Sequence, residues 1–151
     1  ANVERLVLDG VGNIAGTGNS LDNAMAGNTG NNFIDGKGGR DTLSGNGGSD
    51  QFLFTSALSA ATNIDFITDF DVTNDFLRLD DAVFAGLSLG YLSAAAFRIG
   101  AAAADATDRI VYNNATGAVY FDADGLGGVA QVQFARLAAG LALTNADIYV
   151  F

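Results

Sequence analysis

The sequence predicts an all-β fold whose first part is a solenoid of short strands. Four nine-residue segments follow one another without a gap from Gly18 to Leu53, and each begins with Gly. Position eight of every segment is apolar and is occupied by Met25, Ile34, Leu43 and Phe52. A fixed period is typical of repeat proteins, in which each unit buries its apolar face against its neighbours. After Phe54, further segments alternate apolar and polar residues as strands do.

Each nine-residue segment joins a Gly-rich turn to a few residues that favour a strand. Glycine reaches positive φ at little cost, so the first part predicts a tight turn with exposed backbone carbonyls. Position six carries an amide or a carboxylate and is occupied by Asn23, Asn32, Asp41 and Asp50. Oxygens gathered at a turn suit a hard cation, and calcium tolerates an irregular oxygen cage better than magnesium. A flexible linker would not be expected to have an apolar residue at every ninth position, so a repeat structure is favoured over a linker.

Two segments, GKGGRDTLS (residues 36–44) and GNGGSDQFL (residues 45–53), resemble the RTX (repeats-in-toxin) nonapeptide G-G-x-G-x-D-x-U-x, a calcium-binding repeat. Segments 18–26 and 27–35 match less closely, because both have Asn at position six and the first has Leu21 where a glycine is expected. The resemblance implies a parallel β-roll with two nonapeptides per coil. Turns eighteen residues apart would then stack on the same side.

The RTX resemblance implies two calcium sites between stacked turns, one joining loops 18–23 and 36–41 and the other joining loops 27–32 and 45–50. The first would use the carbonyls of Asn19, Leu21, Gly36 and Gly38 and the side chains of Asn23 and Asp41. The second would use the carbonyls of Asn28, Gly30, Gly45 and Gly47 and the side chains of Asn32 and Asp50. Because each site holds one carboxylate, we expect weak binding, with a Kd on the order of 10⁻⁴–10⁻³ M.

A third calcium site is implied next to the second coil. Its ligands from that coil would be the carbonyls of Lys37 and Gly39 and the side chain of Asp41. Ser59 stands where the following position-six residue would fall, so Asp65 or Asp69 would have to replace it. The alternative for this acidic segment is a set of solvated aspartates on a strand whose Phe66 and Phe70 point inward.

The sequence after residue 108 predicts a β-hairpin and an acidic turn. Residues 109–113 and 118–122 read as strands, and residues 114–117 between them (Asn-Ala-Thr-Gly) read as the turn. Asp122 and Asp124 begin a D-x-D-G sequence that opens many calcium loops. The Glu that closes an EF-hand loop is missing, so an ordinary Asp/Gly turn is favoured over a calcium site there.

The C-terminal part also resembles known RTX proteins. DFITDF (residues 65–70) and the D-x-x-x-D-x-x-x-L-D that follows resemble the segment after the repeats in serralysin-type C-terminal domains. Residues 109–125 resemble a hairpin found near the C-termini of RTX proteins, and Asp147–Phe151 resembles the uncleaved signal read by type I secretion exporters. These resemblances imply a calcium-binding β-roll over residues 1–60 and a β-rich cap with a secretion signal over residues 61–151.

The net charge and the absence of His and Cys argue against several classes of function. Seventeen acidic residues against seven basic ones give a net charge of −10, whereas nucleic-acid binding needs a basic surface. The chain contains no His and no Cys, so the usual general base, thiol nucleophile and zinc ligands are absent. It also lacks an apolar stretch of about twenty residues that would predict a transmembrane helix. We therefore predict a non-enzymatic calcium-binding module that is loose in chelator and compact in millimolar calcium.

The RTX resemblance further implies that this module folds on binding Ca²⁺ after type I secretion of a parent protein. Its location would be extracellular, or the cell surface of a Gram-negative bacterium. The implied partners are calcium ions, a type I exporter that reads Asp147–Phe151, and an upstream catalytic or adhesive domain. Two alternatives remain: a structural or adhesive module of a surface layer, or the non-catalytic tail of a secreted protease, lipase or polysaccharide-modifying enzyme.

Overall fold

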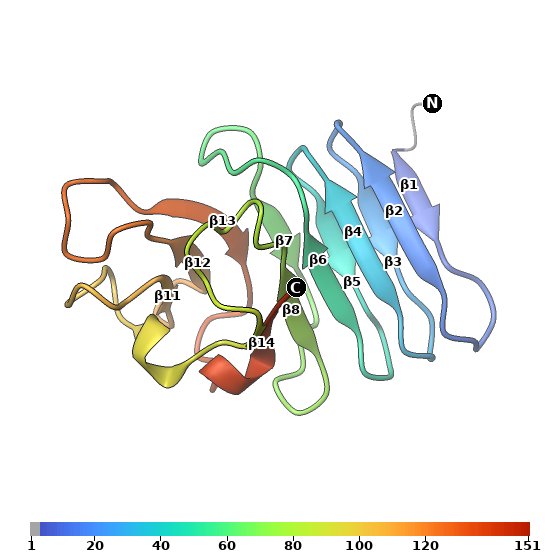
Figure 1. Cartoon of the computed structure of the whole chain (residues 1–151). Coiled ribbons are helices and arrows are strands. Elements are labelled where there is room, and N and C mark those ends of the chain that lie inside the picture. Colours follow the sequence, from blue (N-terminus) through green and yellow to red (C-terminus); the bar gives the residue numbers. More distant parts are fainter. Residues whose placement is uncertain (1–3) are drawn as a thin grey trace.

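Two β-sheets make up most of the molecule (Figure 1). The computed structural model describes residues 4–151. Within that range, one sheet has eight strands in the order β1-β3-β5-β7-β13-β12-β11-β10, and the other has six in the order β2-β4-β6-β8-β14-β9. Strands that follow one another in the first half of the chain therefore alternate between the sheets, as the coils of a solenoid require.

The strands are short, as the nine-residue period demands. Those of the coils are β1 (Arg5–Val7), β2 (Ala15–Asn19), β3 (Ala24–Ala26), β4 (Phe33–Lys37), β5 (Thr42–Ser44), β6 (Gln51–Phe54), β7 (Asp65–Ile67) and β8 (Phe76–Leu79). Those that follow are β9 (Gly90–Tyr91), β10 (Phe97–Ile99), β11 (Ile110–Asn113), β12 (Ala118–Phe121), β13 (Val132–Arg136) and β14 (Ile148–Val150). Two single turns of 3₁₀-helix precede β10 and β14, namely η1 (Ala94–Ala96) and η2 (Asn145–Asp147).

The register of the strands confirms the predicted parallel β-roll. Met25 in β3 pairs with Leu43 in β5, and Ile34 in β4 pairs with Phe52 in β6, each eighteen residues on. These four position-eight side chains are at most 4% exposed, because a strand points alternate side chains to opposite faces and the inner faces of the two sheets meet. Full burial of one such side chain stabilises the fold by roughly 1.5–3 kcal/mol.

The coil before the first nonapeptide differs from expectation. The sequence predicts strands at residues 6–8 and 13–15 with irregular spacing, and Ile14 as the apolar residue of the second. In the structure Gly16 pairs with Ile34, eighteen residues on, so the repeat register already begins at β2. Gly16 occupies the inward position, where an added Cβ would lie 3.1 Å from Leu6 Cδ2 and 3.3 Å from the terminal methyl of Met25. Neighbouring side chains therefore fill the space that an apolar residue would take.

The roll continues beyond the last nonapeptide. Leu43 pairs with Ile67, and Phe52 pairs with Leu77, so β7 and β8 add one more strand to each sheet after an inserted loop over residues 55–64. The expectation that Phe66 points inward is wrong, because Phe66 is 43% exposed. Period two then turns its neighbours Asp65 and Ile67 to the interior. Phe70 lies in the core as expected.

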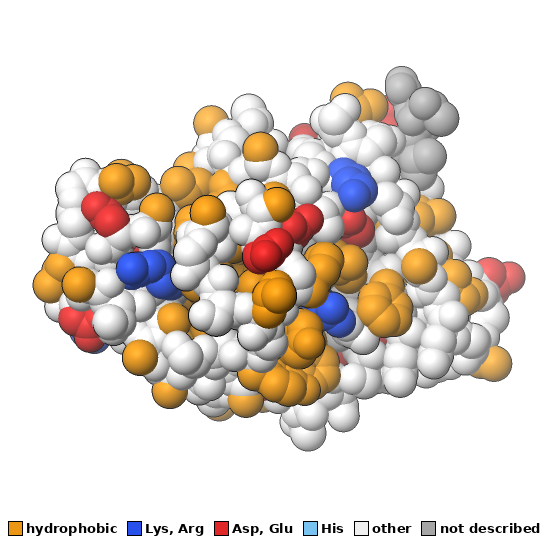
Figure 2. All heavy atoms as spheres, viewed as in Figure 1, with side chains coloured by type: hydrophobic (Ala, Val, Ile, Leu, Met, Phe, Trp, Pro, Cys, Tyr) orange, Lys and Arg blue, Asp and Glu red, His pale blue; other side chains and the backbone are white. Residues whose placement is uncertain are grey.

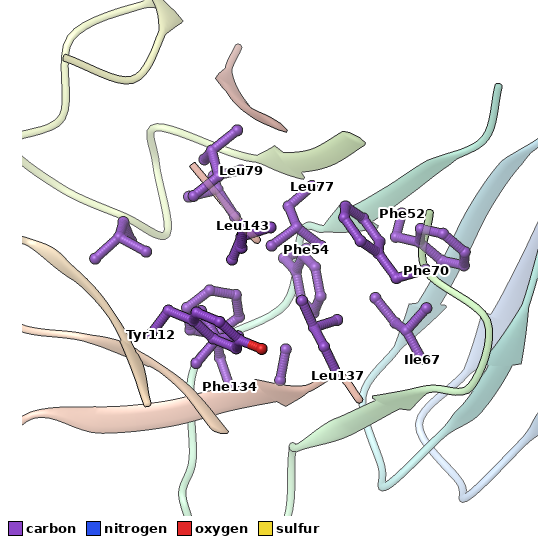
Figure 3. Close-up of a cluster of buried hydrophobic side chains, with 14 of the residues drawn as sticks. Phe52, Phe54, Ile67, Phe70, Leu77, Leu79, Tyr112, Phe134, Leu137 and Leu143 are labelled. Atoms are coloured by element: carbon purple, nitrogen blue, oxygen red, sulfur yellow. The ribbon is translucent and has the colours of Figure 1, made fainter. Parts of the chain in front are cut away.

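The C-terminal strands close the end of the roll. The predicted hairpin is confirmed as the antiparallel pair β11–β12, and β13 joins it to β7. β14 lies between β8 and β9 in the other sheet. Figure 3 shows the resulting core, which contains Phe52 and Phe54 from the roll together with Phe134 and Leu143 from the C-terminal part. The rings of Phe54 and Phe134 are edge-to-face with centroids 4.9 Å apart.

Both sheets and this hydrophobic core continue across residue 60. The sequence predicts a roll over residues 1–60 and a cap over residues 61–151. Strand pairing does not test whether these two parts fold independently, so the division stays a prediction. The position of the cap matters for the site, because it fixes where the column of stacked turns ends.

Candidate calcium sites

The position-six side chains form two columns along the roll. In the first column, the Asn23 N–H donates to Asp41 Oδ1 (2.7 Å), and the Asp41 N–H donates to Asp65 Oδ1 (3.3 Å). All three residues are at most 3% exposed. Because each carboxylate accepts from the backbone of the preceding coil, the column brings oxygens of stacked turns together.

The second column repeats this arrangement one half-coil further along the chain. The Asn32 N–H donates to Asp50 Oδ1 (2.7 Å), and the Asp50 N–H donates to Asp75 Oδ1 (2.9 Å). Sequence reasoning gave Asp75 no ligand role, although it is the second Asp of the D-x-x-x-D-x-x-x-L-D pattern. A local signal was present, because Asp65 and Asp75 both start the same Asp-Phe-apolar triplet, as Asn32 starts Asn-Phe-Ile.

The glycine at position one makes room for the side chain at position six. A Cβ at Gly36 would lie 2.1 Å from Asp41 Oδ2, and one at Gly45 would lie 2.2 Å from Asp50 Oδ2. Real Cβ atoms do not approach other atoms so closely, so the recurring glycine is required by the neighbouring carboxylate. Within its own turn, Asn32 Oδ1 accepts the N–H of Asn28 (2.8 Å).

The backbone oxygens named as ligands lie between stacked turns. A Cβ at Gly18 would be 2.5 Å from the carbonyl oxygen of Gly36, and one at Gly39 would be 2.6 Å from that of Leu21. The second pair of loops repeats this, with the Gly45 carbonyl against Gly27 and the Gly30 carbonyl against Gly48. The carbonyls of Asn19 and Asn28 accept the N–H groups of Gly38 (3.0 Å) and Gly47 (3.1 Å).

The residues of the implied third site are only partly brought together. Asp65 takes the place beside Asp41 that the eighteen-residue spacing assigned to Ser59. Asp69 lies elsewhere, with its carboxylate accepting the N–H groups of Gly45 (3.0 Å) and Asn46 (2.8 Å). On the facing turn, Lys37 has φ +72° and its ammonium lies 3.0 Å from Asp35 Oδ2, while Gly39 has φ +116°.

Burial dominates the electrostatics of the columns. Desolvation raises the pKa of Asp50 from 3.8 to about 6. It also raises the pKa of Asp65, where the adjacent Asp41 carboxylate adds to the effect, and the pKa values of Asp41 and Asp75. A buried carboxylate is costly unless a hydrogen bond or a cation compensates it, and a nearby cation reverses these pKa shifts.

The side chains fit calcium. Asp41 Oδ2 is buried and has no hydrogen-bond partner among residues 4–151, so a cation is the compensation that its position calls for. In the same range, no three His, Cys, Asp or Glu side chains are arranged to hold a metal, so a cation would rely on the backbone carbonyls between the turns. A donor set of carbonyl, amide and carboxylate oxygens suits calcium and does not suit zinc.

The acidic turn at Asp122 and Asp124 closes on itself. Asp122 Oδ1 accepts the N–H of Gly125 (2.8 Å), and Asp124 Oδ2 accepts that of Val129 (3.2 Å). Asp124 Oδ1 is buried without a hydrogen-bond partner in the described part of the chain. Backbone donors hold one oxygen of each carboxylate, and the ordinary Asp/Gly turn expected from the sequence stays a prediction.

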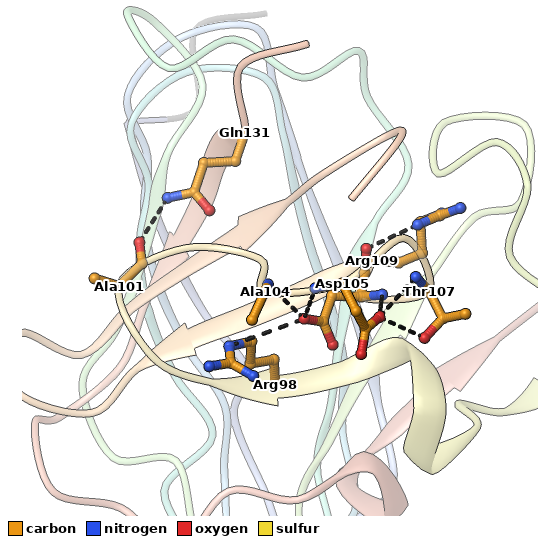
Figure 4. Close-up of polar contacts among 8 residues, drawn as sticks. Arg98, Ala101, Ala104, Asp105, Thr107, Arg109 and Gln131 are labelled. Carbon is orange, nitrogen blue, oxygen red and sulfur yellow. Dashed lines mark hydrogen bonds and ion pairs between the residues drawn. The ribbon is translucent and has the colours of Figure 1, made fainter. Parts of the chain in front are cut away.

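In the neighbouring acidic loop, backbone N–H groups, a hydroxyl and an arginine contact the carboxylates (Figure 4). Asp108 Oδ2 accepts the N–H of Ala104 (2.7 Å) and lies 3.9 Å from Arg98 Nε. Asp105 Oδ1 accepts both the N–H and the hydroxyl of Thr107, which lowers the pKa of Asp105. Asp105 and Asp108 thus have backbone donors, a hydroxyl or an arginine beside them, whereas each column carboxylate accepts a backbone N–H and lies next to further carboxylates of the column.

Comparison with known proteins identifies the repeats. Residues 17–52 match four copies of the RTX calcium-binding nonapeptide repeat. The chain contains an RTX calcium-binding repeat array. The chain is similar in fold to the solution structure of the AlgE6R3 subunit of the Azotobacter vinelandii mannuronan C5-epimerase, with a TM-score of 0.61 and 24% identity. That alignment covers 98% of this chain and 79% of the other.

No curated protein sequence matches the chain. Within residues 4–151, no helix has the length and apolar character needed to cross a membrane. The nonapeptide match covers the four segments on which the two calcium sites were predicted, and the fold match covers the coils and the cap together.

Proposed function

We propose that this chain is a calcium-binding RTX module that folds when Ca²⁺ enters the turns after type I secretion of its parent protein. RTX repeat modules are non-catalytic in themselves, and we propose no catalytic role for this chain. The observation that carries the proposal is the pair of buried position-six columns, with Asp41 Oδ2 left without a protein partner among the described residues.

The proposed ligands of two sites are those that the repeat pattern implies. One calcium would lie between loops 18–23 and 36–41, and another between loops 27–32 and 45–50. The columns support two further positions toward the cap, one between Asp41 and Asp65 and one between Asp50 and Asp75. Each of these would combine two carboxylates, whereas the outer sites combine one carboxylate and one amide. Because calcium affinity follows ligand charge, we expect the positions next to the cap to bind more tightly.

Type I secretion is consistent with a module whose folding depends on calcium binding. RTX repeat proteins are typically secreted by Gram-negative bacteria, and calcium is scarce in the cytosol. Without calcium, the acidic columns oppose folding, because several buried carboxylates lie close together. In calcium, the binding free energy becomes folding free energy. The proposed signal, Asp147–Phe151, would be read before β14 enters the sheet, because Ile148 and Val150 are fully buried in the folded chain.

A calcium titration tests the proposal. Metal-free protein should show weak β ellipticity that rises on adding calcium, with binding measured by calorimetry in the same buffer. Asp41→Asn should weaken calcium binding at least tenfold, because it removes a charged ligand from the first column. Asp22→Asn is the matched control, since Asp22 is exposed in the stacked turn one coil earlier and its Oδ1 accepts the Arg40 N–H. Equal binding by both variants would contradict the proposed sites.

A second candidate is that the chain serves as the non-catalytic accessory module of a larger secreted enzyme. The likeness in fold to the AlgE6R3 subunit of a mannuronan C5-epimerase supports this candidate, although it concerns the fold alone. A surface-layer or adhesive role is the alternative. Calcium-dependent light scattering separates the two, because an accessory module stays monomeric in calcium whereas a layer-forming module assembles.

A further inference from the structure

A small hollow opens on the outer face of the six-stranded sheet. Period two turns Leu77 and Leu79 of β8 into the core and their neighbours Phe76 and Arg78 outward. Strands β6, β8, β9 and β14 together line a hollow of about 200 Å³ with Gln51, Phe76, Arg78, Tyr91 and Tyr149. Figure 2 shows hydrophobic side chains gathered around a basic one on the face that carries β8 and β14 in Figure 1.

Arg78 supplies positive charge to this hollow without a carboxylate partner. The two ion pairs among residues 4–151 use Lys37 and Arg98 instead. The Arg78 guanidinium makes one protein hydrogen bond in that range, from Nη1 to Gln51 Oε1 (2.5 Å), and its Nε is buried without a partner. Since a guanidinium has five donors in a fixed fork, most of its hydrogen-bonding capacity is unused.

Aromatic rings hold the guanidinium in place and present a flat surface beside it. The Arg78 guanidinium carbon lies 4.6 Å from the centroid of the Tyr149 ring and 4.8 Å from that of Phe151. Tyr91 stands edge-to-face against Tyr149 with centroids 5.2 Å apart, and it is 63% exposed. An exposed tyrosine beside a cation with unused hydrogen-bond donors is typical of a site that stacks a ring and binds a negative group.

A second hollow of about 220 Å³ also uses Tyr91 and contains another arginine, Arg109. The Nη1 of Arg109 donates to the carbonyls of Ala106 and Asp108 (both 2.8 Å), which fixes the side chain in place. Ser88, Ser93 and Thr107 add hydroxyl groups to the same hollow. Tyr91 thus takes part in two hollows that each contain one arginine, an arrangement that suits a ligand with repeated rings and repeated carboxylates.

We propose that this face binds a short acidic saccharide, with a uronate ring stacked on Tyr91 and its carboxylates paired with Arg78 and Arg109. Sugar rings present apolar C–H faces to aromatic rings and hydroxyls to polar side chains, and a carboxylate matches the guanidinium fork. A nucleic acid would need a wide basic surface, which a chain with a net charge of −10 does not provide. The same charge repels long polyanions, so binding is confined to a few sugar units.

Titration of ¹⁵N-labelled protein with trigalacturonate, in saturating free calcium, tests this inference. We expect a Kd on the order of 1 mM, with shifts confined to Tyr91, Tyr149 and the Nε–H groups of Arg78 and Arg109. The methyl ester of trigalacturonate is the matched probe, because it keeps the rings and removes the charges. It should bind at least tenfold more weakly. Absence of shifts at 10 mM probe, equal binding of the ester, or shifts elsewhere on the molecule would overturn the proposal.

Two variants separate binding from folding. Arg78→Gln and Tyr91→Leu should each weaken trigalacturonate binding at least tenfold while leaving the calcium titration unchanged. Arg136→Gln is the control, since Arg136 also lies over an exposed ring, at 5.9 Å from the centroid of Phe66, and lines neither hollow. If Arg136→Gln weakens binding as much as Arg78→Gln, the effect is general electrostatics and the site is wrong. Circular dichroism of the same samples reports folding, so failure of this site is distinct from failure of the calcium sites.

Discussion

The glycine at position one offers a sharp test of how the columns are built. Adding a methyl group at Gly36 places Cβ 2.1 Å from Asp41 Oδ2, whereas at Gly38, two residues on, the nearest atom beyond its chain neighbours is 3.8 Å away. Neither glycine has the positive φ that would itself disfavour alanine. Gly36→Ala must therefore displace the Asp41 carboxylate, and Gly38→Ala need displace nothing.

The difference in stability between the two variants follows from the hydrogen bond that the Asp41 carboxylate accepts. Its displacement breaks the 2.7 Å hydrogen bond from the Asn23 N–H. A hydrogen bond to a charged group contributes about 1.5–3 kcal/mol. The loss of unfolded-state entropy on replacing Gly by Ala is the same for both variants and cancels in their difference. We therefore expect Gly36→Ala to be less stable than Gly38→Ala by about 1.5–3 kcal/mol, and to bind calcium at least tenfold more weakly.

Guanidinium chloride unfolding in saturating calcium measures the stability difference, and calorimetry measures the affinity. Gly45→Ala and Gly47→Ala repeat the comparison in the second column, where the distances are 2.2 Å and 3.9 Å. Equal unfolding free energies and equal calcium affinities within each pair would refute the reasoning, because the clash with the carboxylate would then have no consequence.

Three further outcomes follow from the columns and the cap. In metal-free protein, the raised pKa of Asp50 (about 6, against 3.8) means that the folded state retains a proton that the unfolded state has lost. Stability without calcium is therefore greatest below about pH 4 and falls as the pH rises through 6; thermal melts of metal-free protein across this range should give the highest Tm at low pH. Asp75→Asn should weaken calcium binding at least tenfold, whereas Asp71→Asn, which changes an exposed aspartate in the same turn, should not; calorimetry decides. A chain that ends at Phe54 should stay disordered by circular dichroism even in 10 mM calcium, because it exposes Phe52 and Phe54, which the C-terminal residues cover in the full chain.

Sequence reasoning predicted the coils because a solenoid is nearly one-dimensional. When each unit contacts only its neighbours, a period of nine indicates which side chains point inward. Met25, Ile34, Leu43 and Phe52 could therefore be assigned to the core from spacing alone, and the register confirms them. The RTX resemblance, which implies two nonapeptides per coil, put Asn23 and Asp41 in adjacent turns, where the structure also has them.

Prediction from spacing failed where the period changes. The loop over residues 55–64 lengthens the step between stacked residues from eighteen to twenty-four for Asp41 and Asp65, and to twenty-five for Asp50 and Asp75. A fixed offset therefore pointed to Ser59, and Asp75 received no role. Gly16 was missed for a different reason, since its space is filled by side chains from other strands, which no local pattern records.

The hollow around Arg78 lay beyond sequence reasoning altogether. Its residues come from four strands between Gln51 and Tyr149, and they meet only because β14 enters the sheet between β8 and β9. Nothing in the local sequence near Arg78 indicates that two tyrosines will stand beside it. Sites made by long-range strand order need the structure, whereas sites made by a repeat can be read from the repeat.

The two columns also give the module a direction. Counted from the N-terminal end, the stacked pairs change from one carboxylate and one amide (Asn23 with Asp41) to two carboxylates (Asp41 with Asp65), so acidity increases toward the cap. The pairs of two carboxylates repel each other most without calcium, and we expect them to bind calcium most tightly. They lie at the end of the roll that packs against the hydrophobic core of the C-terminal part. If export begins at the C-terminus, the cap and its acidic pairs leave the cell first and meet calcium first. Each folded coil then provides a surface on which the next coil can stack. The order of export and the order of calcium affinity therefore both favour folding from the cap toward the N-terminal coil.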